Sequence, residues 1–282
     1  MTRGGCVVAN EINPQRCARL RVRLAKCRVP GAVVCCAAAQ RMPGADGTYD
    51  RVLCDVPCSG DGTLRKNPDI WDSWQPRFSA SLHPLQLAIL TRGLQLLRPG
   101  GLLLYSTCSF SPVEGEAVVA AALRHCDGVE LVDVHGALPP LVAARGLERW
   151  RVTASEDGSG VGSLDEASEE QRERWRLQPS LFPPMAAELK MLALHRCARV
   201  LPHQQDTGGF FVALLRKGDG AVVRVPECAA PLLAAAADES AAPPPPPRSR
   251  RWATTRRRNC ASFTGSTAAS RGRSCSRRFA TR

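Results

Sequence analysis

The sequence has no cysteine or histidine pair at the spacing of a metal site. None of its 13 cysteines forms a Cys-x-x-Cys pair, and their odd number does not suit a framework of disulfides. Several thiols lie inside apolar runs, where a thiol packs as a small hydrophobic side chain. These are Cys6, Cys35, Cys36 and Cys54. The pattern predicts a reducing compartment, no metal centre and no disulfide scaffold.

Long hydrophobic runs are also absent. No stretch approaches the ~20 apolar residues that a membrane-spanning helix needs, and no secretory leader opens the chain. We therefore expect a soluble, intracellular protein with no membrane partner.

Acidic residues and lysines are missing from residues 248–282, which hold 11 arginines. Residues 1–247 carry 27 basic against 26 acidic side chains, so the net charge of +12 is concentrated in the tail. A basic tail attracts polyanions such as RNA. The Ala- and Pro-rich stretch before it has too little core-forming surface to fold. We expect a folded domain over residues 1–218 and a disordered linker and Arg-rich tail over 219–282.

Apolar strands alternate with amphipathic helices along the folded part. One helix begins at Asn13 and Pro14, an N-cap and a first-turn proline; another carries a series of leucines at helical spacing. Strands that are apolar on both faces, separated by helices, are typical of an α/β protein with a mostly parallel sheet. Residues 136–180 are polar and rich in turn formers, which predicts a surface insertion. The predicted strands span 6–10, 32–36, 50–56, 101–107, 129–134 and 209–215, and the leucines are Leu87, Leu90, Leu94 and Leu97.

Reactive side chains follow three of these strands. Glu11 ends the first, Asp55 and Cys58 follow the third, and Cys108 follows the fourth. In an open parallel sheet, ligands bind beyond the carboxyl ends of the strands. We expect Asp55, Cys58 and Cys108 to meet at this edge.

Two interpretations of Cys108 stand side by side. Ser111, Pro112 and Glu114 fit the N-cap, N1 and N3 positions of a following helix, a capping box. A thiol just before a helix N-terminus lies near a positive dipole end, which favours the thiolate. Alternatively, Cys108 is a small buried residue where a strand passes into a helix.

Two thiols and a carboxylate at one edge suit one reaction in particular. Carbon 5 of cytosine is too weak a nucleophile to take a methyl group directly. A thiolate that adds to carbon 6 turns the ring into an enamine and makes carbon 5 nucleophilic. A second group then assists loss of the carbon 5 proton and release of the thiol, and the base must be unpaired or flipped out.

Four stretches resemble the Nol/Nop/Sun (RsmB/NOP) family of RNA cytosine-5 methyltransferases, most of all its eukaryotic tRNA branch. The resemblance runs from about Cys6 to Lys217 and implies a Rossmann-like class I S-adenosylmethionine-dependent methyltransferase fold. It also implies S-adenosyl-L-methionine as cofactor, RNA and in particular tRNA as partner, a monomer, and a nuclear or nucleolar location. The stretches are "DVPCSGDGTLRKN", "LRPGGLLLYSTCSFSPVEGEAVV", "LQPSLFPP" and "RVLPHQQDTGGFFVALL".

Site roles carry over from the family to single positions. The resemblance implies that Cys108 is the nucleophile on carbon 6 and that Cys58 assists product release. It assigns Asp55 to the cofactor and cytosine site, and Glu11 to the ribose hydroxyls of S-adenosylmethionine. It makes Lys66 a contact to RNA phosphate, whereas a loop lysine without the resemblance would be merely solvated.

The sequence departs from the family around the cofactor. The family's first strand, its glycine-rich loop and its preceding RNA-binding segment have no counterpart before Glu11, and Ala38 stands where a carboxylate usually meets the adenine amine. We therefore expect a partial, N-terminally truncated methyltransferase domain over residues 1–218. The missing strand would lie between strands 6–10 and 50–56. On its own, such a chain should neither bind the cofactor appreciably nor methylate RNA.

Three functions follow from these features. The first is a tRNA or other RNA cytosine-5 methyltransferase. The second is a pseudoenzyme that keeps the fold as an RNA-binding or partner-binding module. The third is a cysteine hydrolase that pairs Cys108 with His83 or His203, although no motif places either histidine near that thiol.

Overall fold

The computed structural model describes residues 5–28, 31–137 and 139–234. The Pro-rich stretch and the arginine-rich tail, predicted to be disordered, lie outside these residues. The predicted boundary at residue 218 falls inside strand β10 (Phe210–Val223), and helix α8 (Ala230–Ala234) follows it. Regular structure therefore continues past that boundary.

The N-terminal part forms a small β-α-β unit. Strand β1 (Val7–Asn10) pairs in parallel with β2 (Ala32–Cys35). Helix α1 (Pro14–Lys26) connects them and begins as predicted: the Asn13 side chain accepts hydrogen bonds from two backbone N–H groups of the first turn, both at 3.0 Å. This cap satisfies donors that have no partner inside the helix.

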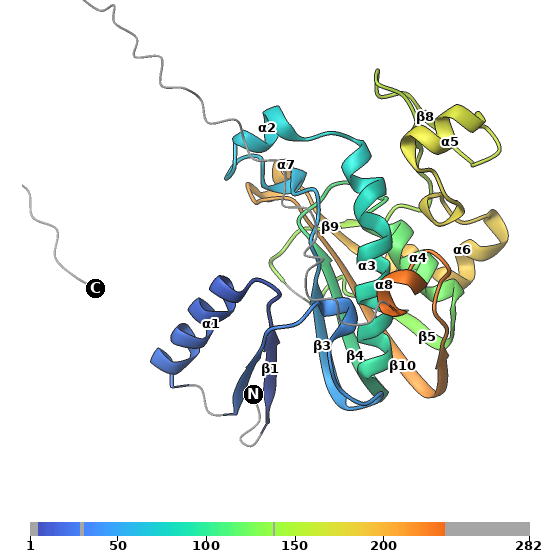
Figure 1. The fold of residues 1–282 in the computed structure, drawn as a ribbon. Helices are drawn as coiled ribbons and strands as arrows, with labels where there is room; N and C mark the ends of the chain where they lie inside the picture. Colours follow the sequence, from blue (N-terminus) through green and yellow to red (C-terminus); the bar gives the residue numbers. More distant parts are fainter. Residues whose placement is uncertain (1–4, 29–30, 138, 235–282) are drawn as a thin grey trace, which may run out of the picture. The chain divides into compact units, whose positions relative to one another are not determined.

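The larger sheet holds the remaining long strands (Figure 1). Strand β3 (Tyr49–Asp55) pairs in parallel with β4 (Leu97–Thr107). Strand β10 runs antiparallel to β4 on one side and to β5 (Cys126–Val132) on the other, so β3, β4 and β5 share one direction. The first residues of β10 also pair with β9 (Ala198–Val200), which in turn pairs with β6 (Ala144–Arg145).

A groove of about 220 Å³ separates the two sheets. Its walls include Val8 and Asn10 of β1 and Leu53 and Asp55 of β3. Among the described residues, β1 pairs only with β2 and β3 only with β4, so the edges that face the groove carry unpaired backbone groups. Leu53 is 67% exposed. The groove lies where the sequence predicts an additional strand.

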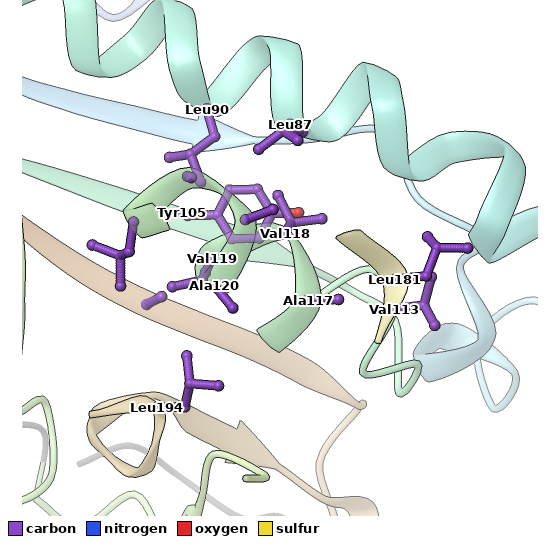
Figure 2. Packing of buried hydrophobic residues seen from close by; sticks show 14 of the residues in the cluster. Leu87, Leu90, Tyr105, Val113, Ala117, Val118, Val119, Ala120, Leu181 and Leu194 are labelled. Atoms are coloured by element: carbon purple, nitrogen blue, oxygen red, sulfur yellow. The ribbon is translucent and has the colours of Figure 1, made fainter. Parts of the chain in front are cut away.

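Helices α3 (Arg77–Leu96) and α4 (Glu116–Arg124) pack against each other and against the larger sheet. Leu87 and Leu90 meet Tyr105 and the alanine- and valine-rich face of α4 in a fully buried core (Figure 2). The sequence placed Leu97 on the α3 face as well, which is wrong. Its backbone is extended (ψ 131°), and it begins β4, although it is fully buried.

Residues 136–180 were predicted to be a surface insertion, which is right for most of the segment, whose side chains are exposed or half-buried, and wrong for its tryptophans. Trp150 and Trp175 are buried in the hydrophobic core, and the Trp150 indole donates a hydrogen bond to the Leu181 carbonyl at 2.8 Å. Two tryptophans in a polar, turn-rich segment were the signal for core packing. The segment contains β7 (Val152–Thr153), β8 (Gly160–Val161) and α5 (Glu169–Trp175). The remaining short helices are η1 (Ala39–Arg41), η2 (Asp61–Thr63), α2 (Asp69–Ser73), η3 (Pro179–Leu181), α6 (Ala186–Leu192), η4 (Leu194–Arg196) and α7 (Pro202–Gln205).

A buried ion pair joins α4 to β9. The Arg199 guanidinium donates to both carboxylate oxygens of Glu116, at 2.8 and 2.7 Å, and also to the Phe110 carbonyl. Glu116 is fully buried and accepts a further hydrogen bond from the backbone N–H of Leu147 at 2.8 Å. Removing one partner of such a pair leaves an uncompensated charge in the core.

We expect Arg199→Met to lower the free energy of unfolding by about 3–5 kcal/mol, because Glu116 then stays buried without its cation. Arg124→Met is the matched control: its pair with Glu188 is partly exposed, so its loss should cost about 1 kcal/mol or less. Urea denaturation followed by circular dichroism measures both. Equal decreases in the free energy of unfolding for the two variants would contradict the prediction that the buried pair stabilises the fold more than the exposed one.

Candidate active site

Two cysteine thiols meet where adjacent strands end. Cys58 follows β3 and Cys108 follows β4, and the parallel pairing sets Asp55 opposite Ser106. The two Sγ atoms are 3.2 Å apart and share a hydrogen bond. The Ser106 hydroxyl donates to Asp55 at 3.0 Å, so this carboxylate belongs to the same edge. The three residues expected to meet at the strand ends therefore do so.

The shared hydrogen bond makes the two thiols unequal. The pKa of Cys108 is lowered, first by the hydrogen bond from Cys58, against the opposing effects of burial and of Asp55 and Asp61. The pKa of Cys58 is raised by the same bond, by burial and by the negative charge of Glu114. Ionisation of the pair is therefore easier at Cys108 than at Cys58, which is the more deeply buried thiol and lies nearer the charge of Glu114.

The capping box predicted after Cys108 is wrong. Helix α4 begins at Glu116, with Gly115 before it and no side-chain cap. Residues 111–115 form a turn in which the Ser111 carbonyl accepts from the backbone N–H groups of Glu114 and Gly115, at 3.1 and 3.2 Å. The Glu114 side chain is buried instead of capping a helix. The thiolate is thus favoured by a neighbouring thiol and not by a helix end.

Glycines explain the turn that follows Cys58. Gly60 has φ +77°, a left-handed conformation that suits glycine. The Gly62 N–H donates to the Cys108 carbonyl at 2.9 Å, and its carbonyl accepts from Gly209 at 2.7 Å. A side chain on Gly62 would lie 2.7 Å from the Cys108 oxygen. Three loops can therefore touch only because glycine stands at this position.

Two carboxylates between these loops were not assigned to the site from the sequence. Asp61 is buried, which raises its pKa, and it accepts a hydrogen bond from the Phe110 N–H at 2.8 Å. Glu114 contacts the residues next to both cysteines. In the sequence, both acids stand in loops among glycine, serine and proline. Such a local pattern does not predict a buried carboxylate.

Glu11 and Lys66 lie apart from the thiol pair. Glu11 follows β1; one carboxylate oxygen accepts from the Asn13 N–H at 3.0 Å, and the other pairs with Arg16 at 2.9 Å. Lys66 is exposed after η2. Within the described part of the chain, neither side chain forms a hydrogen bond or an ion pair with Cys58 or Cys108.

The histidines do not serve the thiols. His83 is fully buried; its Nδ1 meets the Val113 carbonyl at 2.8 Å and its Nε2 meets the Ser180 hydroxyl at 3.0 Å. Burial lowers its pKa to about 4, so it is neutral at pH 7. His203 is exposed on α7. Neither histidine hydrogen-bonds Cys108, so the geometry gives no support to a cysteine hydrolase.

In the ranges 5–28, 31–137 and 139–234, no three His, Cys, Asp or Glu side chains gather as a metal ion would require. No helix in these ranges is long and apolar enough to cross a membrane.

A cavity of about 200 Å³ lies beside the Cys108 loop. The structure, and not the sequence, identifies its lining. Asp61 and Phe110 form the side nearest the thiols, while aromatic and basic side chains from distant segments complete it. These are Trp74, Arg77, Arg151 and Trp175.

Solved structures define the class of fold. The crystal structure of NSun6 from Pyrococcus horikoshii with SFG matches with a TM-score of 0.52 at 20% identity, over 76% of this chain and 41% of that one. The fold is therefore Rossmann-like, of the kind found in S-adenosylmethionine-dependent methyltransferases, as the sequence predicted.

The family described as 16S rRNA methyltransferase RsmB/F matches residues 1–158, and the chain belongs to this family. A multisite-specific tRNA:(cytosine-C(5))-methyltransferase of Schizosaccharomyces pombe is 42% identical over 234 residues, 76% of this chain and 34% of its own. The tRNA (cytosine(34)-C(5))-methyltransferase of Drosophila melanogaster is 39% identical over 224 residues, 76% of this chain and 30% of its own. The chain thus spans about a third of the length of these relatives.

The unequal thiols predict unequal alkylation by iodoacetamide. Because its pKa is lowered, Cys108 should hold more thiolate at neutral pH and react faster than Cys58. Cys58→Ala removes the hydrogen bond, so the pKa of Cys108 should rise and its reaction at neutral pH should slow. Peptide mapping by mass spectrometry follows each site. Cys126, whose pKa burial raises to about 11, should stay slow in both proteins; faster alkylation of Cys58 than of Cys108 would reverse the assignment.

Proposed function

We propose that this protein is an S-adenosylmethionine-dependent RNA cytosine-5 methyltransferase with tRNA as its substrate. One observation carries the proposal: the 3.2 Å pair of Cys58 and Cys108 at the ends of two parallel strands. Two inequivalent thiols suit a reaction that needs both a nucleophile and a second group for its release. Membership of an RNA methyltransferase family, and relatives named for cytosine-C(5) methylation of tRNA, agree with it.

In the proposed reaction, the Cys108 thiolate attacks carbon 6 of cytosine, and carbon 5 becomes nucleophilic as an enamine. The cofactor, when bound, supplies the methyl group that carbon 5 takes. Transfer of the carbon 5 proton to a water molecule then restores the double bond and expels Cys108 as a thiolate, which can again accept the hydrogen bond of the Cys58 thiol. We assign assistance in this release to Cys58. Its sulfur lies at 3.2 Å from the leaving sulfur.

The described residues fit part of a cofactor site. Asp55 ends β3 at the groove between the sheets, and Asn10 lies on the opposite wall. Glu11 directly follows the carboxyl end of β1, just as Asp55 stands at the carboxyl end of β3. The Glu11 carboxylate can accept hydrogen bonds from the vicinal hydroxyls of a ribose. We propose that Glu11 and Asp55 hold the cofactor and that the described residues, through α8, supply part of the catalytic domain.

The cavity beside the Cys108 loop suits the approach of RNA. Arg77 and Arg151 are exposed side chains at its lining, and guanidinium groups bind phosphate and stack on bases. Lys66 is exposed in the loop between η2 and α2, and we propose it as a further contact to RNA phosphate. Backbone contacts of this kind position the RNA, while the thiol edge selects the base.

The roles of the thiols can be separated by a covalent RNA adduct. The assay uses the chain extended by the sequence of the fission yeast relative that lies outside the matching region, incubated with substrate RNA and cofactor. Cys58→Ala should accumulate a slowly migrating protein–RNA adduct on a denaturing gel, because attack proceeds but release is impaired. Cys108→Ala should give neither adduct nor methylated RNA. Cys126→Ala, outside the site, is the control, and an adduct with Cys108→Ala would exchange the two roles.

Cofactor binding tests the groove. Isothermal titration with S-adenosylmethionine should show no appreciable binding to the chain alone. It should show binding once the segment from the relative supplies a strand for the free edges of β1 and β3. Asp55→Asn in the extended protein should weaken that binding. Micromolar binding by the chain alone would mean that the described residues suffice. If binding is restored and methyl transfer is still absent, the non-catalytic RNA-binding or partner-binding function is favoured instead.

A further inference from the structure

Glu114 is fully buried and is surrounded by hydrogen-bond donors. Its carboxylate accepts from the Ser59 N–H at 2.9 Å and from the Ser59 hydroxyl at 2.5 Å. It also accepts from the hydroxyls of Ser79 and Ser109, both at 2.8 Å, and from the Gln86 amide at 2.8 Å. Five donors therefore converge on one side chain.

These donors come from the two thiol loops and from α3. Ser59 directly follows Cys58, and Ser109 directly follows Cys108. The Ser59 and Ser109 hydroxyls also meet each other at 3.3 Å. Glu114 is thus the one side chain in the described part of the chain that accepts from the immediate neighbours of both cysteines.

Helix α3 anchors the carboxylate from behind. Ser79 and Gln86 both lie on this helix and are buried. The Gln86 amide donates to Glu114 and also to the Pro57 carbonyl at 2.9 Å, which precedes Cys58. The loop of Cys58 is therefore hydrogen-bonded on both sides of the thiol: Gln86 binds the residue before Cys58, and Glu114 binds the residue after it.

A carboxylate suits this position because it only accepts hydrogen bonds. An amide in its place would turn an NH₂ group toward donors and leave some of them without an acceptor, which is costly in a buried site. The nearby Glu116 differs, since Arg199 compensates its charge. Within the described part of the chain, Glu114 forms no ion pair, so neutral hydrogen-bond donors are its polar partners.

We propose that Glu114 is a positioning residue that sets the separation of the Cys58 and Cys108 sulfur atoms by holding both loops against α3. The importance of Glu114 for catalysis rests on the function proposed above. Its effect on the distance between the two sulfur atoms does not depend on that function. When the separation is lost, the hydrogen bond between the thiols is lost with it, and Cys108 is no longer favoured as the thiolate.

Other titratable groups face the same pair. Asp55 from β3 and Asp61 from η2 both oppose the thiolate of Cys108. The Tyr105 hydroxyl from β4 donates to the Glu114 carbonyl at 2.6 Å and stays neutral, because burial and nearby negative charge raise its pKa. His83 from α3 is neutral at pH 7. All four remain in a Glu114 variant. Loss of the Glu114 charge by itself would favour ionisation of the pair, since that charge raises the pKa of Cys58, so a fall in Cys108 alkylation reports on the geometry of the thiol pair.

The test compares Glu114→Gln with Glu116→Gln in the full chain, without RNA or cofactor. Both variants remove a buried negative charge from neighbouring positions, but only Glu114 touches the thiol loops. Iodoacetamide alkylation of Cys108 is measured from about pH 6 to about pH 9, around the ordinary thiol pKa. Phenylarsine oxide, which bridges two close thiols, reports the pairing of Cys58 with Cys108 by mass spectrometry. Circular dichroism follows the fold.

In Glu114→Gln, alkylation of Cys108 at pH 7 should fall about tenfold, which is one unit of thiol pKa. Arsenical bridging of the pair should fall with it. Glu116→Gln should lose thermal stability and keep both thiol properties. A folded Glu114→Gln protein with an unchanged pH profile and unchanged bridging would overturn the proposal.

Ser109→Ala decides the matter if Glu114→Gln does not fold, because it removes a single donor from the Cys108 loop. It should shift the profile in the same direction by less, while Ser81→Ala, an exposed α3 serine, should not. An unchanged profile in Ser109→Ala would then count against the proposal. Since neither RNA nor cofactor is present, a failure here leaves the methyltransferase proposal standing, and a failure of methyl transfer leaves this result intact.

Discussion

The parallel pairing of β3 with β4 is the constraint on which the site depends. It sets Asp55 opposite Ser106, so that the loops after both strands leave the sheet at the same edge. Two thiols that are 50 residues apart in the chain then lie 3.2 Å apart. At this distance they share one hydrogen bond, and their different burial and neighbouring charges lower the pKa of Cys108 and raise that of Cys58.

Pairing alone would not hold two flexible loops in register. Backbone contacts at Gly62 bring the Cys108 loop and the start of β10 together, at a separation that only glycine permits. Glu114 adds a polar centre to which both thiol loops and α3 donate. The site is therefore stabilised by buried polar groups as well as by the apolar core beneath α3 and α4.

The larger sheet and the β1–β2 unit differ in how many of their strands have a hydrogen-bonded neighbour on both sides. The larger sheet is paired continuously from β3 through β4 and β10, packs against α3 and α4, and carries the thiols. The β1–β2 unit faces it across a groove with unpaired strand edges on both sides. The chain spans about a third of its relatives' length, and the unpaired strand edges lie on the side of the site that Asp55 lines.

The sequence by itself determined the six longer strands, the Asn13 cap, the family and the meeting of the two cysteines. These depend on local periodicity and on the rule that parallel strands end at one edge. Tertiary structure alone decided the rest. Glu114 looked like a helix cap because a capping box is a local pattern, yet its partners on α3 lie far from it in the chain. Trp150 and Trp175 lie in a polar segment but pack in the core, since burial depends on which distant surfaces meet. The opposite pKa shifts of the two thiols also depend on a contact across 50 residues, which no local pattern encodes.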